Sequence, residues 1–153
     1  VEKLARLRRP RLADVKIAAH VFPTSYTAVD RDLPKLIAEH EPDAILMFGL
    51  APRARALRIE TRARNTAALL PDAGGAARAA KIALGTPLAL RLPAPTVQLL
   101  AAAHAARVPA MRSHDAGRYL CNYLCWRAAE AACRDGGPRI AAGIENVRET
   151  TRT

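Results

Sequence analysis

The sequence predicts an α/β fold, a three-layer α/β/α sandwich with a largely parallel or mixed sheet. Residues 44–50 (Ala-Ile-Leu-Met-Phe-Gly-Leu) form a continuous apolar run of strand length, which is typical of a central parallel strand. Short apolar runs alternate with stretches of helical spacing along the chain, as in βαβ units. The 153 residues are enough to bury a core, so we expect one domain over residues 1–153.

The first half of the chain supplies five predicted segments. The leucines at 4 and 7 indicate the end of a helix that stops near Pro10. An apolar run closed by Pro23 predicts a buried strand over residues 15–22. Capping residues at 24–26 precede helical spacing that ends near residues 40–42. After the run at 44–50, apolar and charged residues alternate over 57–65, which predicts an extended segment with one covered face.

The second half is read in the same way. Residues 69–86 contain Gly74 and Gly75 and show no clear period, which predicts a loop with at most one helical turn. The other predicted segments are strands at 87–92, 108–112 and 139–144, helices at 96–107 and 118–134, and a frayed polar tail from 146. The last helix is ended by Gly136, Gly137 and Pro138.

The charge of the chain narrows the classes of partner. A formal net charge of +10 is typical of proteins that bind nucleic acids or anionic membranes. A basic protein that binds anionic partners is therefore one alternative function. The basic residues are scattered apart from one cluster at 6–11, and only 4% of residues are aromatic and able to stack on bases. We therefore expect an arginine-rich solvated surface and no nucleic-acid partner.

The sequence carries no signal for a membrane span, a secretion signal, a disulfide framework or a metal site. No run approaches the ~18 apolar residues of a membrane span, and the N-terminal residues do not form a secretion signal. Three cysteines are an odd number for a disulfide framework, so a reducing cytoplasm is expected. The cysteine spacing and the dispersed histidines do not match a metal site, and we expect neither a metal nor a cofactor.

Cys121 is the first candidate for a nucleophile. It follows a predicted strand and a turn with Gly117, and it falls in the first turn of the helix predicted over 118–134. Unpaired N–H groups at a helix start stabilise a thiolate and an oxyanion. The alternative is that Cys121 packs as a small buried hydrophobe, which is how we interpret Cys125 and Cys133 on the same helix.

Two motifs resemble a known family. Residues 116–122 (Ala-Gly-Arg-Tyr-Leu-Cys-Asn) resemble the Ala-Gly-x-Phe/Tyr-Val/Leu-Cys-Asn nucleophile motif of pyroglutamyl-peptidase I, the pyrrolidone-carboxylate peptidases. Upstream, Glu60, Ala63 and Asn65 are similar to the family's Glu-Arg-x-Ala-x-Asn segment, and residues 22–26 to its Val-Pro-Thr run. The likeness extends from about residue 15 to about residue 144.

The resemblance implies a function and a set of residues. It implies a cysteine-type omega-peptidase, a hydrolase that removes N-terminal pyroglutamate from peptides, with Cys121 as nucleophile and Glu60 as the catalytic acid. It also implies a homo-oligomer. A second interpretation of Glu60 is a solvent-facing strand residue paired with Arg58 or Arg62.

The sequence also departs from the family pattern. Glu145 stands where the family has its base histidine, when the chain is aligned without gaps from Cys121. The family's N-terminal strand and loop are lacking before Val1, and residues 49–53 replace a glycine-rich loop. Loss of the base predicts impaired catalysis, and a catalytically inactive family member acting as a binding or assembly protein is the alternative.

Two histidines are candidates to replace the missing base. His114 lies in the turn before Cys121, and His20 lies on the first predicted strand. A solvent-exposed position for His114 and a satisfied strand position for His20 are the simpler interpretations. His40 and His104 fall on helix faces and are assigned no role.

Overall fold

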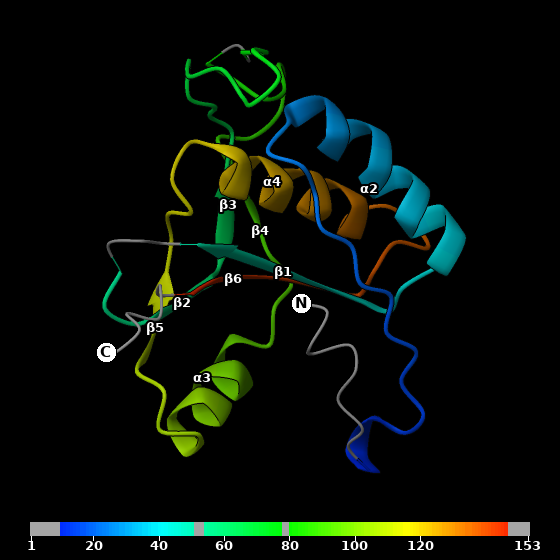
Figure 1. Ribbon diagram of the computed structural model, residues 1–153, viewed down its shortest axis with the longest axis vertical. Helices are drawn as coiled ribbons and strands as arrows, with labels where there is room; N and C mark the ends of the chain where they lie inside the picture. The colour runs from blue at the N-terminus through cyan, green and yellow to red at the C-terminus, as the bar shows by residue number, and fades with distance from the viewer. Residues whose placement is uncertain (1–9, 51–53, 78–79, 147–153) are drawn as a thin grey trace.

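The fold is seen in a computed structural model, which describes residues 10–50, 54–77 and 80–146 (Figure 1). The helical elements are a short 3-10 turn η1 (Pro10–Leu12), α2 (Tyr26–His40), α3 (Thr96–Ala105) and α4 (Leu120–Ala132). The strands are β1 (Ala44–Leu50), β2 (Leu57–Glu60), β3 (Arg62–Arg64), β4 (Ala89–Arg91), β5 (Ala110–Ser113) and β6 (Ile140–Asn146).

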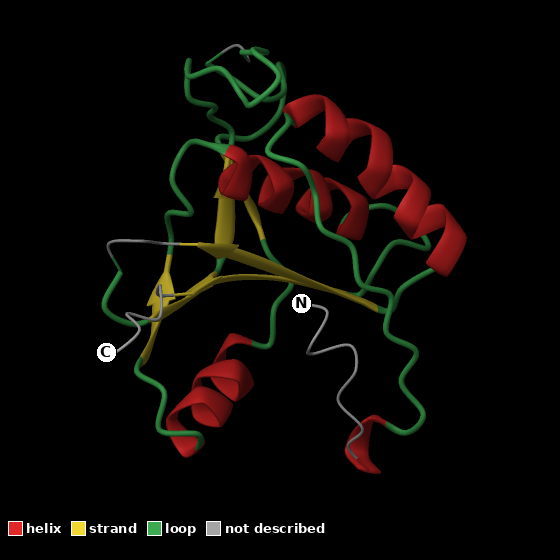
Figure 2. Ribbon diagram, in the orientation of Figure 1, coloured by secondary structure: helices red, strands yellow, loops and turns green. Residues whose placement is uncertain are grey.

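The strands form a mixed four-stranded sheet and a small two-stranded one. The order in the larger sheet is β1-β6-β2-β5. In it β1 is parallel to β6 and β2 is parallel to β5, whereas β2 and β6 are antiparallel. Figure 2 shows α4 and α2 on one side of this sheet and α3 on the other, which confirms the predicted α/β fold with a mixed sheet.

Strand register decides which side chains face α4. Gly143 of β6 pairs with Met47 of β1 on one side and with Glu60 of β2 on the other, and Glu60 also pairs with Ser113 of β5. Paired residues point to the same face of a sheet. Met47 packs in the core cluster that contains Trp126 of α4, so all four of these positions belong to the α4 face.

Helix α2 begins and ends where its local sequence directs. The side chain of Ser25 accepts a hydrogen bond from the backbone N–H of Ala28 at 3.4 Å, as an N-cap does. The carboxylate of Asp72 accepts the N–H of Tyr26 at 2.8 Å, which places negative charge at the helix start. Burial raises the pKa of Asp72, but backbone hydrogen bonds from three N–H groups outweigh it and the pKa is lowered. The helix ends at Glu41, whose φ of 41° is left-handed.

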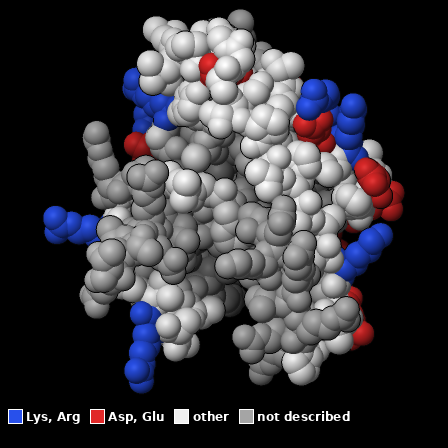
Figure 3. Space-filling model, viewed as in Figure 1, with Lys and Arg blue, Asp and Glu red and all other residues white. Residues whose placement is uncertain are grey.

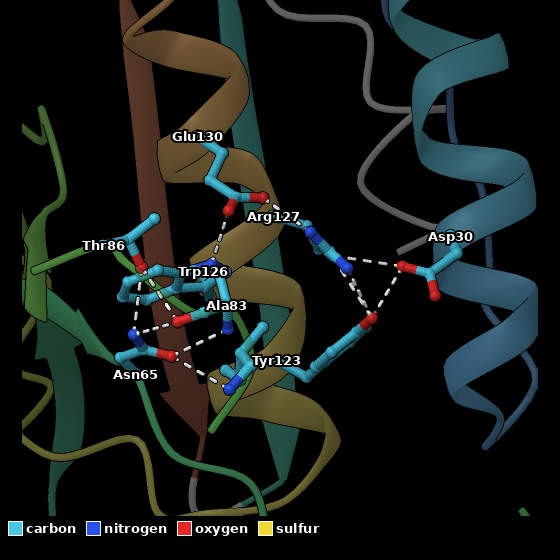
Figure 4. Close-up of polar contacts among 9 residues, drawn as sticks. Asp30, Asn65, Ala83, Thr86, Tyr123, Trp126, Arg127 and Glu130 are labelled. Atoms are coloured by element: carbon cyan, nitrogen blue, oxygen red, sulfur yellow. Dashed lines mark hydrogen bonds and ion pairs between the residues drawn. The ribbon is translucent and has the colours of Figure 1, made fainter. Parts of the chain in front are cut away.

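A polar network joins α2 to α4 (Figure 4). The hydroxyl of Tyr123 donates to Asp30 of α2 at 2.7 Å, and the guanidinium of Arg127 contacts the same carboxylate at 3.1 Å. Arg127 also pairs with Glu130 at 2.8 Å, and Glu130 accepts the indole N–H of Trp126 at 2.7 Å. These shared bonds fix the rotation of α4, and therefore the direction in which its first turn faces.

Two strand predictions were wrong. Residues 15–22 are not a strand, and Val15, Ile17 and Val21 are exposed. No described strand pairs with this segment, and an apolar run becomes a strand only when a partner edge satisfies its backbone. Residues 44–50 do form a strand parallel to β6, but at the edge of the sheet instead of its centre.

Most other predicted elements are confirmed with shifts of one or two residues at their ends. The stretch 69–86 is a loop in its described part. Cys133 is exposed, so its assignment to the core was wrong; it is the C-cap residue beyond the last turn of α4. The helix end expected over residues 1–7, most of the arginine cluster at 6–11, the altered loop at 51–53 and the tail from 147 lie outside the described residues.

Two further predictions concern charge and membranes. On the face shown in Figure 3, the described lysines and arginines lie around the rim, several of them beside acidic residues, and do not form one continuous patch. Within the described ranges, no helix has the length and apolar character needed to span a bilayer.

Candidate active site

Glu60 is a fully buried carboxylate at the end of β2, with 0% of its surface exposed. Neither carboxylate oxygen has a hydrogen-bond partner among the described residues, and Nη2 of Arg58 lies 3.5 Å from Oε1. Burial raises the pKa of Glu60, and the nearby Ser113 hydroxyl and Arg58 charge offset only part of that effect. The interpretation of Glu60 as a solvent-facing residue is therefore wrong, although Arg58 is its neighbour as expected.

Arg58 connects Glu60 to the turn before α4. Its Nη2 donates to the hydroxyl of Ser113 at 2.6 Å and to the carbonyl of Asp115. The carboxylate of Asp115 in turn accepts the N–H of Gly117 at 3.0 Å and pairs with Arg64 at 2.8 Å. The turn that leads into α4 is therefore held by bonds from β2 and β3.

Gly117 allows the turn to reverse. Its φ is 79°, a left-handed conformation that L side chains rarely adopt. The left-handed backbone therefore explains why the motif at residues 116–122 has a glycine at this position. The turn predicted there is confirmed.

Cys121 is the second residue of α4 and is half-buried. Tyr119 occupies the N-cap position without making a side-chain cap bond. The backbone N–H groups of the first turn are consequently not capped by that side chain, and they add positive partial charge near the thiol. The predicted placement of Cys121 in the first turn of a helix against the sheet is confirmed.

The neighbouring Asn122 has a structural role that the sequence motif did not predict. Its side chain is buried; its Oδ1 accepts the N–H of Arg64 at 2.8 Å, and its Nδ2 donates to the carbonyls of Arg64 and Thr66 at 2.8 and 2.9 Å. Asn122 therefore fastens the first turn of α4 to the end of β3, only a few residues beyond Glu60.

Asn65, the last residue of the Glu60 motif, holds the loop that follows. Its Oδ1 accepts the N–H groups of Ile82 and Ala83, both at 2.9 Å. Its Nδ2 donates to the carbonyls of Ala83 and Pro87 and to the hydroxyl of Thr86 (Figure 4). The Asn65 amide therefore holds residues 82–87 of the loop against the end of β3.

Gly143 lies between α4 and Glu60. A Cβ at this position would lie 2.7 Å from the Sγ of Cys125 and 3.3 Å from the Cβ of Glu60. Cys125 follows Cys121 by one helical turn and faces the same side of α4. The candidate thiol and the candidate carboxylate therefore belong to the same interface, that between α4 and the sheet.

Position 145 is placed by its backbone. Glu145 pairs with Gly49 of β1 and with Arg58 of β2, one step along the ladder from the pair of Glu60 and Gly143. Glu145, which the motif alignment predicts to stand at the family's histidine position, thus lies on the strand that also pairs with Glu60.

Three of the four histidines contact groups other than Cys121. Nδ1 of His114 lies 2.5 Å from the hydroxyl of Thr61, and His20 lies in a loop beside Phe22, with Nε2 3.9 Å from Asp32. Nε2 of His104 lies 3.3 Å from the carbonyl of Ala110, and His40 is the last residue of α2. Among the described residues, no group of three or more His, Cys, Asp or Glu side chains is arranged to hold a metal ion.

Sequence reasoning missed two residues of this interface, Ser113 and Gly143. Arg58 was expected beside Glu60, because its position two residues earlier puts both on one face of an extended strand. Ser113 and Gly143 carried no local signal, because only the strand order β6-β2-β5 brings them beside Glu60.

The layered fold and the residues at this interface define the class as α/β proteins with a mixed sheet, on which packs a helix that carries a half-buried cysteine in its first turn. The family model described as pyroglutamyl peptidase matches residues 2–147, and the chain belongs to that family. This confirms the family suggested by the motifs.

Individual relatives agree with this assignment. The pyrrolidone-carboxylate peptidase of Pyrococcus furiosus is 29% identical over 136 residues, which cover 88% of this chain and 65% of the relative. The protein of the same name from Clavibacter michiganensis is 31% identical over 72% of this chain and 53% of its own length. A solved structure of the P. furiosus enzyme, its E192Q mutant, superposes with a TM-score of 0.85 at 27% identity, covering 94% of this chain and 69% of that one. The chain thus spans 65% or less of the curated relatives named here.

Proposed function

We propose that this chain provides the nucleophile and the carboxylate of a cysteine peptidase that removes N-terminal pyroglutamate from peptides. Cys121 attacks the carbonyl carbon that follows the pyroglutamyl ring, and the thioester that forms after loss of the amine is then hydrolysed by water. The observation that carries the proposal is the burial of Glu60, on the sheet face covered by α4, without a hydrogen-bond partner among the described residues. A carboxylate held in that way is costly for the fold, and such groups cluster at functional sites.

We also propose that turnover is slow. The leaving amine must gain a proton, and a histidine supplies it in the family pattern, where this chain has Glu145. A carboxylate cannot replace the imidazole as the proton donor when it is ionised, and an ionised Glu60 on the α4 face of the sheet opposes a thiolate by like-charge repulsion. Removal of a triad base reduces rates by several orders of magnitude in well-studied hydrolases.

The test is release of the fluorophore from a pyroglutamyl-coumarin substrate, with Cys121→Ala as the active-site variant. Cys133→Ala is the matched control, because it removes an exposed thiol at the opposite end of the same helix. We expect slow release that Cys121→Ala abolishes and Cys133→Ala leaves unchanged. Rapid turnover at neutral pH would refute the impaired site, and unchanged release by Cys121→Ala would refute the nucleophile.

Glu145 favours a second candidate function, a catalytically inactive family member that binds pyroglutamyl peptides or takes part in an assembly. Calorimetric titration with a pyroglutamyl peptide separates the two: binding without any Cys121-dependent release supports the inactive member. Native mass measurement tests the homo-oligomer that both versions include. Both also place the chain in a reducing compartment such as the cytoplasm, where its three cysteines remain thiols.

A further inference from the structure

A cleft of about 610 Å³ opens where the first turn of α3 meets the ends of β4 and β5. Its charged lining residues are all arginines, Arg62, Arg91 and Arg112, and His114 lines it beside them. Arg112 immediately precedes Ser113 in β5 and pairs with Ile59, so it lies on the α3 face of the sheet, opposite to the face of Glu60. The cleft is therefore separate from the candidate peptidase site.

Two of the arginines oppose each other directly. Arg62 of β3 and Arg91 of β4 are cross-strand partners in an antiparallel pair. Like charges in that position are destabilising. In the part of the chain that the structure describes, no ion pair joins either of these arginines or Arg112 to a carboxylate. The nearby Asp115 is engaged with Arg64 at 2.8 Å.

Hydrogen bonds orient two of the basic groups. Nε of Arg62 donates to the carbonyl of His114 at 3.0 Å, which anchors one edge of the guanidinium. The hydroxyl of Thr61 donates its single proton to the carbonyl of Ser113 at 2.9 Å, so Nδ1 of His114, 2.5 Å away, must be the donor to that hydroxyl. The imidazole is thereby fixed with its Nδ1 protonated, and its orientation is set by Thr61, the residue between β2 and β3.

We propose that this cleft binds a small dianion of the phosphate or sulfate type, either free or as the terminal group of a small molecule. Guanidinium groups present paired N–H donors that match the oxygens of such an anion. A bound dianion relieves the repulsion between Arg62 and Arg91. The volume is within the range of small-molecule sites and exceeds that of one inorganic ion, which leaves room for a phosphomonoester.

The direct test is calorimetric titration of the full chain with sulfate, inorganic phosphate and phenyl phosphate, at ionic strength held constant with sodium chloride. We expect saturable binding at one site, and a weaker constant by about tenfold for Arg91→Gln and for Arg112→Gln, since each loses a charge-assisted hydrogen bond. Tighter binding of phenyl phosphate assigns the site to a phosphomonoester, and equal binding assigns it to the free ion. No saturable binding of any of the three would overturn the proposal.

The matched control is Arg134→Gln, which removes the same charge from an exposed position just beyond α4. It should bind sulfate as the unmodified chain does; a loss equal to that of Arg91→Gln would mean unspecific attraction by net charge. A second readout does not need the ligand. Arg91→Gln should raise the thermal midpoint in the absence of sulfate, because the Arg62–Arg91 repulsion is gone, and should lose the rise that sulfate produces in the unmodified chain. A lower midpoint without sulfate, together with a retained sulfate response, would refute the site.

Discussion

Glu60 and Gly143 face each other across the antiparallel β2–β6 pair, and the absence of a side chain at 143 is what leaves space for Glu60. A Cβ at 143 would come within 3.3 Å of the Cβ of Glu60 and within 2.7 Å of the Sγ of Cys125. The sheet and α4 therefore approach each other closely beside the buried carboxylate. Glycine at this position sets the depth of the interface that also carries Cys121.

Gly143→Ala should destabilise the fold by about 1–3 kcal/mol, because the new methyl group overlaps the sulfur of Cys125. In an open strand position the same change would be favourable by roughly 0.5–1 kcal/mol, so the sign of the effect is informative. The free energy of unfolding in urea measures it. Adding Cys125→Ala to Gly143→Ala should restore part of the loss, and strict additivity of the two changes would contradict the contact.

Glu60 should make stability fall as pH rises. Its pKa is raised above the ordinary value of 4.5, so at pH values between the two the unfolded chain has released a proton that the folded chain keeps. The contribution is fully present below about 4.5 and is lost as pH rises through the folded pKa. It amounts to about 1.4 kcal/mol for each pH unit that separates the folded pKa from the unfolded one.

Urea unfolding from acid to neutral pH tests this contribution. Glu60→Gln should remove that fall and be more stable relative to the unmodified chain at neutral than at acid pH. Glu39→Gln, at an exposed position on α2, is the control and should follow the unmodified curve. If Glu60→Gln also follows that curve, the raised pKa is disproved.

Asn122→Asp should cost more stability at neutral pH than Asn122→Ala. Alanine loses three hydrogen bonds to β3 and its loop, a loss of about 2–3 kcal/mol, whereas aspartate also sets a buried charge against two carbonyl oxygens. Denaturant unfolding of the two variants, at neutral pH and again in acid where the aspartate is protonated, measures the difference. Equal stability of Asn122→Asp and the unmodified chain would show that the amide does not fasten α4 to β3.

Glu145→His should raise the rate of pyroglutamate release by at least tenfold, if the missing base is the only defect. A positioned base contributes about 10²–10⁴-fold, and part of that is expected from an imidazole introduced without its orienting partners. The gain should vanish when Cys121→Ala is added. Glu39→His, which introduces an imidazole on the exposed side of α2, should give no gain. An unchanged rate for Glu145→His would place the defect outside the base.

Local pattern predicted the helices well, because capping and apolar spacing act within one segment. The N-cap at Ser25 and the glycine turn at Gly117 both occur where the sequence indicated. The alternation over residues 57–65 predicted one covered face, but Ile59 and Glu60 are both fully buried because α3 lies over one side of the sheet and α4 over the other. Alternation reports a difference between faces, and it does not reveal that both are covered.

What the sequence could not provide was pairing between distant segments. Residues 15–22 have the composition of a strand yet have no partner among the described strands, while β1 has a partner on one side only. Asn65 and Asn122 belong to the two motifs that resemble the family, but their amides have structural roles. Asn65 holds the loop that follows β3, and Asn122 joins α4 to β3. Such contacts depend on which strand neighbours which, and one sequence read alone does not contain that order.

The position of β1 at the rim of the sheet affects how copies of this chain behave in solution. Leu46, Phe48 and Leu50 are exposed on it, beside backbone groups that no described strand pairs. The formal net charge of +10 makes copies of the chain repel one another. The range of this repulsion falls from about 10 Å at 0.1 M salt to about 3 Å at 1 M. We therefore expect concentrated salt to favour contacts between copies through this edge, and dilute buffer to oppose them.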